Sequence, residues 1–142
     1  MNKGLYIMEI KRVWEDERIE EFVAEEFSDY ATECGVDLNF EEFCFIAEDD
    51  GRIAGIITGR AYYNEVHIAD LIVGKEYRRD GVGSSLVAAV EDAFKKKGYA
   101  KISLTTFGFQ APAFYKKLGY ELEFVREDHD PKLSKYFYLK KI

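Results

Sequence analysis

A glycine loop between an apolar run and a helical pattern constrains the fold of this chain more than any other feature. The run Leu71-Ile72-Val73 is typical of a buried strand, and the loop Arg78-Arg79-Asp80-Gly81-Val82-Gly83 follows it. A helix that opens near Gly83 has amides without intrahelical acceptors, which attract anions. The two glycines leave space for a phosphate oxygen and can adopt positive φ. Because Gly-x-Gly also occurs in ordinary turns, the predicted phosphate site depends on the elements around it.

The segments on both sides of the loop predict a chain of mixed helices and strands. Before the loop we expect a strand at 5–13, a helix between an N-cap at Asp16 and a stop at Gly35, and a short helical turn at 37–42. Three consecutive antiparallel strands follow at 43–48, 53–63 and 66–73, with turns at Asp50-Gly51 and Asn64-Glu65. After the loop the pattern predicts a helix at 84–98, a strand at 101–107, a helix at 112–118 that Gly119 ends, and strands at 120–127 and 136–141.

Length and charge limit the possible partners. The 142 residues fit one domain spanning residues 1–142. Asp and Glu number 27 against 20 Lys and Arg, which argues against nucleic acid and suits a cationic substrate. The two cysteines indicate neither a disulfide framework nor zinc. No signal peptide or membrane span is apparent, so we expect a cytoplasmic protein without a membrane partner.

Acidic residues on the expected first helix have two interpretations. A solvated helix face is favoured over a surface that steers a cationic substrate. These residues are Glu20, Glu21, Glu25, Glu26, Asp29 and Glu33.

The order of elements, together with three separated motifs, resembles the GNAT superfamily of acetyl-CoA-dependent N-acyltransferases. The motifs are the loop 78–83, the strand end 71–73 before it, and the segment Gln110-Ala-Pro-Ala-Phe-Tyr-Lys-Lys-Leu-Gly-Tyr120. The resemblance implies a single-domain α/β fold with a central twisted mixed sheet and helices on both faces. It also implies a V-shaped splay between the strands 66–73 and 101–107, through which acetyl-CoA passes.

The same resemblance implies the contacts with acetyl-CoA. The main chain at 71–73 is expected to bind the pantetheine arm, the amides of 79–84 the pyrophosphate, and the two arginines to add positive charge. Asp80 departs from the family pattern and is expected to point to solvent. Gln110 stands where the family often has Asn, and either bonds the cofactor arm or caps the helix start. The expected cofactor residues are Leu71, Ile72, Val73, Arg78, Arg79, Asp80, Gly81, Val82, Gly83, Ser84 and Gln110.

The chemistry requires a proton acceptor, because an alkyl ammonium has a pKa of roughly 10 and cannot attack a thioester while protonated. His67, Asp70 and Glu65 lie on or just before the strand that lines the cleft, and a water relay is a fourth possibility. Strand alternation puts His67 on one face with Leu71 and Val73 and leaves Asp70 on the other, unless a bulge intervenes. His67 occupies a position where relatives can carry a base, and its ordinary pKa near 6.5 suits the task.

Two donors complete the expected site. A main-chain N–H of Ile72 or Val73 is the family-like donor to the developing oxyanion. Tyr115 matches the helix tyrosine of the family and is expected to give a proton to the departing sulfur, although an aromatic core residue is the alternative.

These observations favour an N-acetyltransferase that moves an acetyl group from acetyl-CoA to a primary amine by direct attack in a ternary complex. A small-molecule amine is favoured over a peptide or protein amine, but the acceptor itself is not identified. The alternative is a noncatalytic CoA-binding or interaction module with the same fold. The mechanism requires no metal, and a homodimer is plausible by resemblance.

Overall fold

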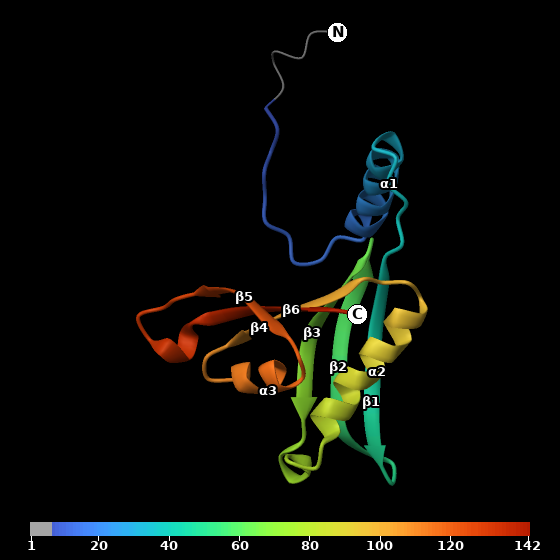
Figure 1. Ribbon diagram of the computed structural model, residues 1–142. Coiled ribbons are helices and arrows are strands. Elements are labelled where there is room, and N and C mark those ends of the chain that lie inside the picture. The colour runs from blue at the N-terminus through green and yellow to red at the C-terminus, as the bar shows by residue number, and fades with distance from the viewer. Residues whose placement is uncertain (1–6) are drawn as a thin grey trace. The chain divides into compact units, whose positions relative to one another are not determined.

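The computed structural model describes residues 7–142, which fall into one unit ending at Asp37 and a second unit, Leu38–Ile142 (Figure 1). Each unit is described by itself, so a single domain over the whole chain stays a prediction. No helix within residues 7–142 has both the length and the apolar character that a membrane crossing requires.

The first unit contains one helix, α1 (Arg18–Glu33), close to the predicted bounds. The N-cap is Glu17 rather than the expected Asp16, and Glu17 makes no side-chain cap bond. The Asp16 carboxylate, one residue earlier, accepts a hydrogen bond from the Arg18 amide at 3.1 Å. At the other end Gly35 has φ +70°, and the Val36 amide donates to the Ala31 carbonyl at 2.8 Å. The predicted glycine stop is therefore confirmed.

Two other predictions for the start of the chain are wrong. Residues 7–13 form no strand, and residues 5 and 6 lie outside the described part of the chain. A strand needs a neighbour for its backbone hydrogen bonds, and the described residues of this unit form no second strand. Residues 37–40 form no helical turn either. Within the second unit, the Asn39 side chain instead donates to the Tyr63 carbonyl at 2.7 Å, which holds this segment beside a turn distant in sequence.

The second unit is built on a six-stranded mixed sheet in the order β1-β2-β3-β4-β6-β5. All neighbouring strands are antiparallel except β3 and β4, which are parallel. The predicted fold class, α/β with a mixed sheet, is confirmed. The strands are β1 (Glu41–Asp49), β2 (Arg52–Tyr62), β3 (Glu65–Val73), β4 (Lys101–Phe107), β5 (Glu121–Arg126) and β6 (Lys135–Lys141).

Two tight turns join the first three strands. Asp50 and Gly51 have φ of 49° and 80°, as a two-residue hairpin with positive φ at both positions requires. The second turn is Tyr63-Asn64 rather than Asn64-Glu65, because Tyr63 takes the positive φ of 56° and Glu65 already begins β3. The three antiparallel strands are as predicted.

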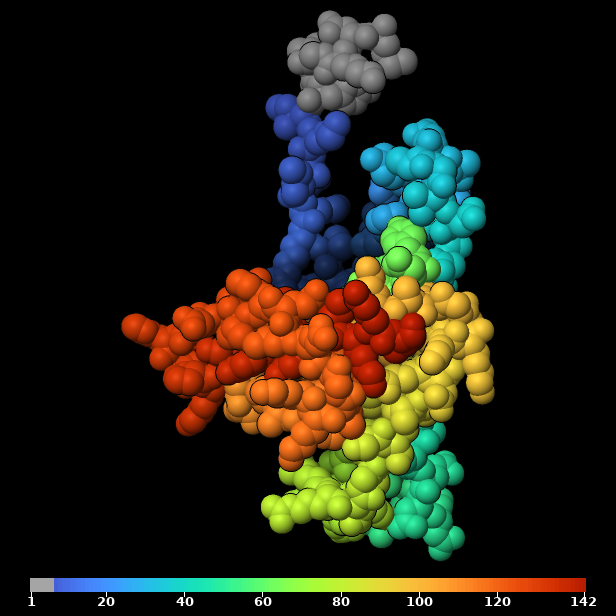
Figure 2. All heavy atoms as spheres, viewed as in Figure 1, coloured from blue at the N-terminus to red at the C-terminus, as the bar shows by residue number. Residues whose placement is uncertain are grey.

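Helix α2 (Val82–Lys96) packs on β1, β2 and β3, and α3 (Pro112–Lys117) contributes to the same buried cluster (Figures 1 and 2). Gly98 and Gly119 follow the two helices with φ of 88° and 92°, which confirms both as stops. Helices on both faces of the sheet stay a prediction, because α1 belongs to the other unit. The largest fully buried side chains are Phe94, Ile57, Ile102, Leu104, Val66, Val87 and Val90.

Candidate functional site

The two parallel strands of the sheet pair over a short stretch and then separate. Their paired positions are Glu65 with Lys101, Val66 with Ile102, and His67 with Ser103. Beyond His67, and among residues 7–142, β3 pairs with β2 alone and β4 with β6 alone, so the predicted V-shaped splay is confirmed (Figure 1). The inner edges of both strands therefore leave backbone donors and acceptors for another extended chain.

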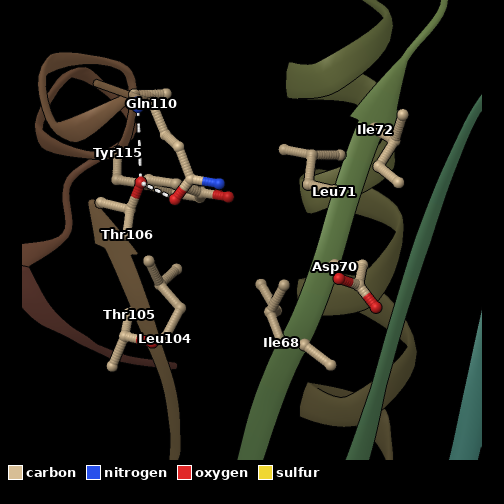
Figure 3. Close-up of a pocket in the computed structure, with 11 residues that line it drawn as sticks. Ile68, Asp70, Leu71, Ile72, Leu104, Thr105, Thr106, Gln110 and Tyr115 are labelled. Carbon is tan, nitrogen blue, oxygen red and sulfur yellow. Dashed lines mark hydrogen bonds between the residues drawn. The ribbon is translucent and has the colours of Figure 1, made fainter. Parts of the chain in front are cut away.

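A cavity of about 250 Å³ lies in this gap (Figure 3). Leu71 points into it from β3, while Gln110 and Tyr115 point toward it from the segment after β4. The cavity thus brings together residues about 40 positions apart in the chain that the sequence assigned to one site. Its walls are formed by Ile68, Ala69, Asp70, Leu71, Ile72, Leu104, Thr105, Thr106, Gln110, Ala111 and Tyr115.

Backbone direction selects which residues of β3 face the gap. The Gly74 amide donates to the Ala54 carbonyl on β2 at 2.8 Å. Successive residues of a strand present their backbone groups to alternate edges. Val73 and Leu71 therefore present their N–H and carbonyl groups to the gap, and Ile72 presents its groups to β2.

A β-bulge at Ala69 changes the expected alternation of side chains along β3. Thr58 pairs with Asp70 and Gly59 with Ile68, which leaves Ala69 as an extra residue. His67 and Asp70 consequently lie on the same face, and Leu71 lies on the opposite face. The expectation that alternation separates His67 from Asp70 is wrong for this reason.

Glycine at position 59 permits this bulge. A Cβ there would meet the His67 carbonyl oxygen at 2.1 Å and the Phe43 ring at 2.5 Å, and neither the backbone nor the packed ring can move freely. The close approach of β2 and β3 beside the bulge therefore requires the absence of a side chain.

Replacing Gly59 with alanine is expected to lower the free energy of unfolding by about 1–3 kcal/mol, because one of the close neighbours must shift. Urea unfolding measures the change. Gly74→Ala is the matched control, since its nearest neighbour would lie at 3.3 Å. Equal stability of the two variants would contradict the role of Gly59.

His67 lies at the last paired position of the splay, is half-buried, and adjoins Ile68 at the end of the cavity without lining it. Its Nδ1 is 3.1 Å from the Ser103 hydroxyl, which donates to the Glu65 carboxylate at 2.8 Å. Burial lowers the pKa of His67 below its usual 6.5, and the positive charge of Arg60 acts in the same direction. The imidazole is therefore neutral at pH 7, as a base must be.

The other candidate bases differ in their surroundings. The Asp70 carboxylate accepts a hydrogen bond from the Thr58 hydroxyl at 3.2 Å and points away from the cavity (Figure 3). Glu65 reaches His67 only through Ser103. Sequence patterns did not identify Ser103, because the register of a parallel pair is not encoded in either strand alone.

The glycine loop leads directly into the start of α2. A short 3₁₀ turn, Lys75–Tyr77, precedes it, and Arg79 and Gly81 have φ of 73° and 79°. The first hydrogen bond of the helix is donated by the Ser85 amide to the Gly81 carbonyl at 3.0 Å. The amides of 82–84 therefore have no intrahelical acceptor.

Glycine is required at the two positions of the loop for different structural reasons. A Cβ on Gly81 would meet no atom within 4 Å, so its positive φ is what requires glycine. Gly83 instead lies inside α2 without positive φ, and a Cβ there would lie 3.2 Å from the Phe114 ring. Gly83 thus permits α3 to approach the start of α2, which the sequence did not indicate.

The charged residues of the loop are exposed. Arg78 Nε donates to the Val73 carbonyl at 3.4 Å, which folds this side chain back toward the splay. Arg79 and Asp80 are exposed as well.

Gln110 does not cap α3, whose start at Ala111 has no side-chain cap, and its contact with the cofactor arm stays a prediction. Its Oε1 accepts from the Phe107 amide at 2.8 Å and so closes the turn after β4. Its amide nitrogen points toward β3 across the gap (Figure 3). The oxygen therefore has a local structural partner, and the NH₂ group points into the gap.

Tyr115 lies beside Gln110 on the same wall and is 7% exposed. Its ring packs edge-on against Phe114 and Tyr120, at centroid distances of 5.1 and 5.8 Å. Burial raises the pKa of Tyr115 to about 12, so the phenol keeps its proton at neutral pH. Tyr115 is thus both a core residue and a hydroxyl donor at the cavity.

Within the described residues no three His, Cys, Asp or Glu side chains form a group that could hold a metal ion. Backbone groups line the cavity, together with the Gln110 amide, the Tyr115 phenol and the polar residues Thr105, Thr106 and Asp70. The backbone groups suit a ligand with an extended amide backbone.

Comparison with known proteins gives a consistent result. The model of the acetyltransferase (GNAT) family matches residues 8–120. Blasticidin-S acetyltransferase of Streptomyces morookaense is 30% identical over 93 residues, which cover 65% of this chain and 68% of that protein. Three further curated N-acetyltransferases are matched over 52%, 30% and 57% of their own length.

Two solved structures extend the likeness to the fold. A crystal structure of an acetyltransferase from Bacillus cereus is 36% identical, with a TM-score of 0.76 over 93% of this chain and 98% of that chain. The PaiA N-acetyltransferase of Thermoplasma acidophilum, solved in complex with coenzyme A, has a TM-score of 0.60 at 23% identity. That match covers 92% of this chain and 81% of the other, and at this identity it shows the fold alone.

Proposed function

Because the chain belongs to the GNAT acetyltransferase family and is an acetyl-transfer enzyme, we propose that it acetylates the primary amine of a small molecule by direct attack on acetyl-CoA in a ternary complex. The observation that carries this proposal is the cavity between β3 and β4, with backbone groups on one side and Tyr115 on the other. Acetyl-CoA-dependent N-acetylation is the general activity of the relatives. The acceptor and the residue roles are the proposed part.

In the proposed complex the pantetheine arm lies along β3 as a substitute strand. Leu71 and Val73 supply backbone groups to its amides, and Gln110 supplies its NH₂ group from the opposite wall. The pyrophosphate lies against the amides of 82–84 at the start of α2, where the helix dipole favours negative charge. Arg78 and Arg79 add positive charge, and exposed Asp80 remains in solvent.

In the proposed mechanism His67 accepts the proton that the substrate amine must lose. Acetyl-CoA supplies an activated thioester as the acetyl donor. Of the two expected donors to the carbonyl oxygen, Ile72 presents its backbone to β2, and Val73 lies outside the residues that line the cavity. Leu71 lines the cavity and presents its N–H to the gap, so we propose it as the donor as negative charge develops on that oxygen. Tyr115 donates to the departing sulfur.

Release of free thiol from acetyl-CoA, measured against a panel of small amines and basic peptides, tests the proposal. Calorimetric binding of acetyl-CoA on the same preparation separates binding from turnover. Binding with release that depends on a small amine would support the proposal. Release only with peptides would overturn the acceptor class, and failure to bind acetyl-CoA would overturn the cofactor assignment.

Gly81→Ala is expected to weaken acetyl-CoA binding about tenfold or more, because the positive φ that aims the loop amides becomes costly and a methyl group enters the phosphate space. Calorimetry on the variant measures the loss. Gly51→Ala is a matched control, since Gly51 has φ +80° and also no neighbour within 4 Å, but lies in the β1–β2 turn. Both substitutions carry the same backbone strain. Equal affinities for acetyl-CoA would contradict the pyrophosphate assignment.

A further inference from the structure

Three side chains form a hydrogen-bonded row where β3 and β4 are still paired. His67 Nδ1 lies 3.1 Å from Ser103 Oγ, and Ser103 Oγ lies 2.8 Å from Glu65 Oε2. The other oxygen of Glu65 is 3.9 Å from Lys101 Nζ. All of these residues belong to the short paired part of the splay, which ends where the cavity begins.

The protons in this row can be assigned from its chemistry. An ionised carboxylate only accepts hydrogen bonds, so the single hydroxyl proton of Ser103 points to Glu65. The Ser103 oxygen then accepts, and within residues 7–142 the group recorded at hydrogen-bond distance on its other side is His67 Nδ1, which must carry the proton to donate it. The neutral imidazole therefore carries its proton on Nδ1 and has its lone pair on Nε2.

We propose that Ser103, held by Glu65, is a positioning residue that fixes the tautomer and the ring orientation of His67, so that Nε2 receives the proton of the acceptor amine. This inference rests on the proposed function, in which His67 is the base. A proton passes from the substrate ammonium to Nε2, and the electron pair of the broken N–H bond stays on the amine nitrogen. That pair then forms the bond to the acetyl carbon. When the carbon–sulfur bond breaks, the sulfur takes a proton from Tyr115, and the second proton that the nitrogen loses passes through solvent to the Tyr115 oxygen. The products are a neutral amide and a free thiol, with the phenol restored and one proton held on His67.

The charges around His67 fit this role. Arg60 on β2 and Lys135 on β6 lower the pKa of His67, as burial does, and Glu65 raises it. Asp70 lies on the same face of β3, and Lys101 on β4 is near Glu65. Burial first, and then the two cations, keep the imidazole neutral before the reaction. The Ser103–Glu65 pair stabilises the positive charge after the proton arrives, because Nδ1–H still donates toward a carboxylate.

The chain offers a direct spectroscopic test, because it has two histidines and His129 is exposed. Long-range ¹H–¹⁵N correlation spectra of the protein without ligand distinguish Nδ1–H from Nε2–H imidazoles. We expect His67 to be in the Nδ1–H form above its pKa, with His129 as the internal reference. An Nε2–H form of His67 in the unsubstituted protein would overturn the proposal.

Substitutions at Ser103 test whether its hydroxyl orients His67 or only supports the fold. Ser103→Ala is expected to release His67 from the Nδ1–H form, whereas Ser103→Thr keeps the hydroxyl and is expected to retain that form. The His129 signals should not change in either variant. An unchanged His67 tautomer in Ser103→Ala would show that the serine does not set it and would refute the inference.

Glu65→Gln tests the second link of the row. The substitution removes the charge that raises the pKa of His67, so a pH titration of its ring resonances should show a pKa lower than in the unsubstituted protein. An unchanged or higher pKa would exclude Glu65 from the row. These spectra need neither acetyl-CoA nor an acceptor, so their outcome is independent of the thiol-release assay.

Measurement of kcat then tests whether the hydrogen-bonded row of Glu65, Ser103 and His67 contributes to catalysis. With an amine identified by thiol release, Ser103→Ala should lower kcat about tenfold, with acetyl-CoA affinity unchanged, and Ser103→Thr should restore most of the rate. A normal kcat in Ser103→Ala despite a changed tautomer would refute the catalytic part of the inference alone.

Discussion

Tyr115→Phe is expected to lower kcat about 100-fold and to leave the affinity for acetyl-CoA within about twofold. The substitution removes one hydroxyl from the cavity wall and keeps the ring that packs against Phe114 and Tyr120. The fold and the cofactor contacts along β3 are thereby preserved. Only the donor to the departing sulfur is lost, so the effect should appear in the chemical step.

The raised pKa of Tyr115, about 12, also predicts how the rate depends on pH. The phenol stays protonated throughout the neutral and mildly basic range, so no loss of rate below about pH 10 should come from its ionisation. Single-turnover kinetics measure the chemical step without interference from product release.

Tyr138→Phe is the matched control for this experiment. Tyr138 is 5% exposed and its ring centroid is 6.3 Å from that of Tyr115, but it does not line the cavity. The same chemical change there should leave kcat nearly unaltered. Equal rates for Tyr115→Phe and the unsubstituted enzyme would remove Tyr115 as the donor.

His67→Gln is expected to lower kcat about 100-fold at neutral pH. It should also remove the fall in kcat at low pH, the acid limb of the pH–rate profile, that protonation of the imidazole causes. The direction follows from the charge state of the base: as pH falls, His67 becomes protonated and can no longer accept a proton. Because burial lowers the pKa of His67, this limb should lie below pH 6.5 in the unsubstituted enzyme. The pH dependence of kcat from about pH 5 to about pH 9 measures both effects.

His129→Gln provides the control, because it changes the other histidine of the chain, which is exposed. It should leave the pH profile as it is. If His67→Gln and the unsubstituted enzyme had the same acid limb, the proton acceptor would have to be Asp70, Glu65 or an ordered water.

Features that depend on local sequence were predictable in this chain. Asp50-Gly51, Gly98 and Gly119 end their elements at positive φ, and the strand 101–107 has the bounds that its pattern predicts. The splay was predictable only through the resemblance of the glycine loop and the segment 110–120 to a known family. A resemblance carries long-range information that no single element contains.

Features that depend on long-range contacts were not predictable. The bulge at Ala69 arises because β2 and β3 approach closely at Gly59, and nothing within β3 indicates an extra residue. Tyr63 takes the positive φ of the second turn while Asn39, 24 residues away, bonds to its backbone. The strand expected at 5–13 followed from composition alone, and composition does not supply a pairing partner.

The contact between Gly83 and Phe114 has a consequence for the length of the acetyl donor. Phe114 packs against the first turn of α2, and the next residue, Tyr115, enters the cavity. In the proposed complex this contact fixes the distance between the phosphate-binding amides of α2 and the Tyr115 hydroxyl that meets the sulfur. Thioesters with an arm shorter or longer than pantetheine would present their sulfur out of reach, so the enzyme would select its donor by length as well as by charge.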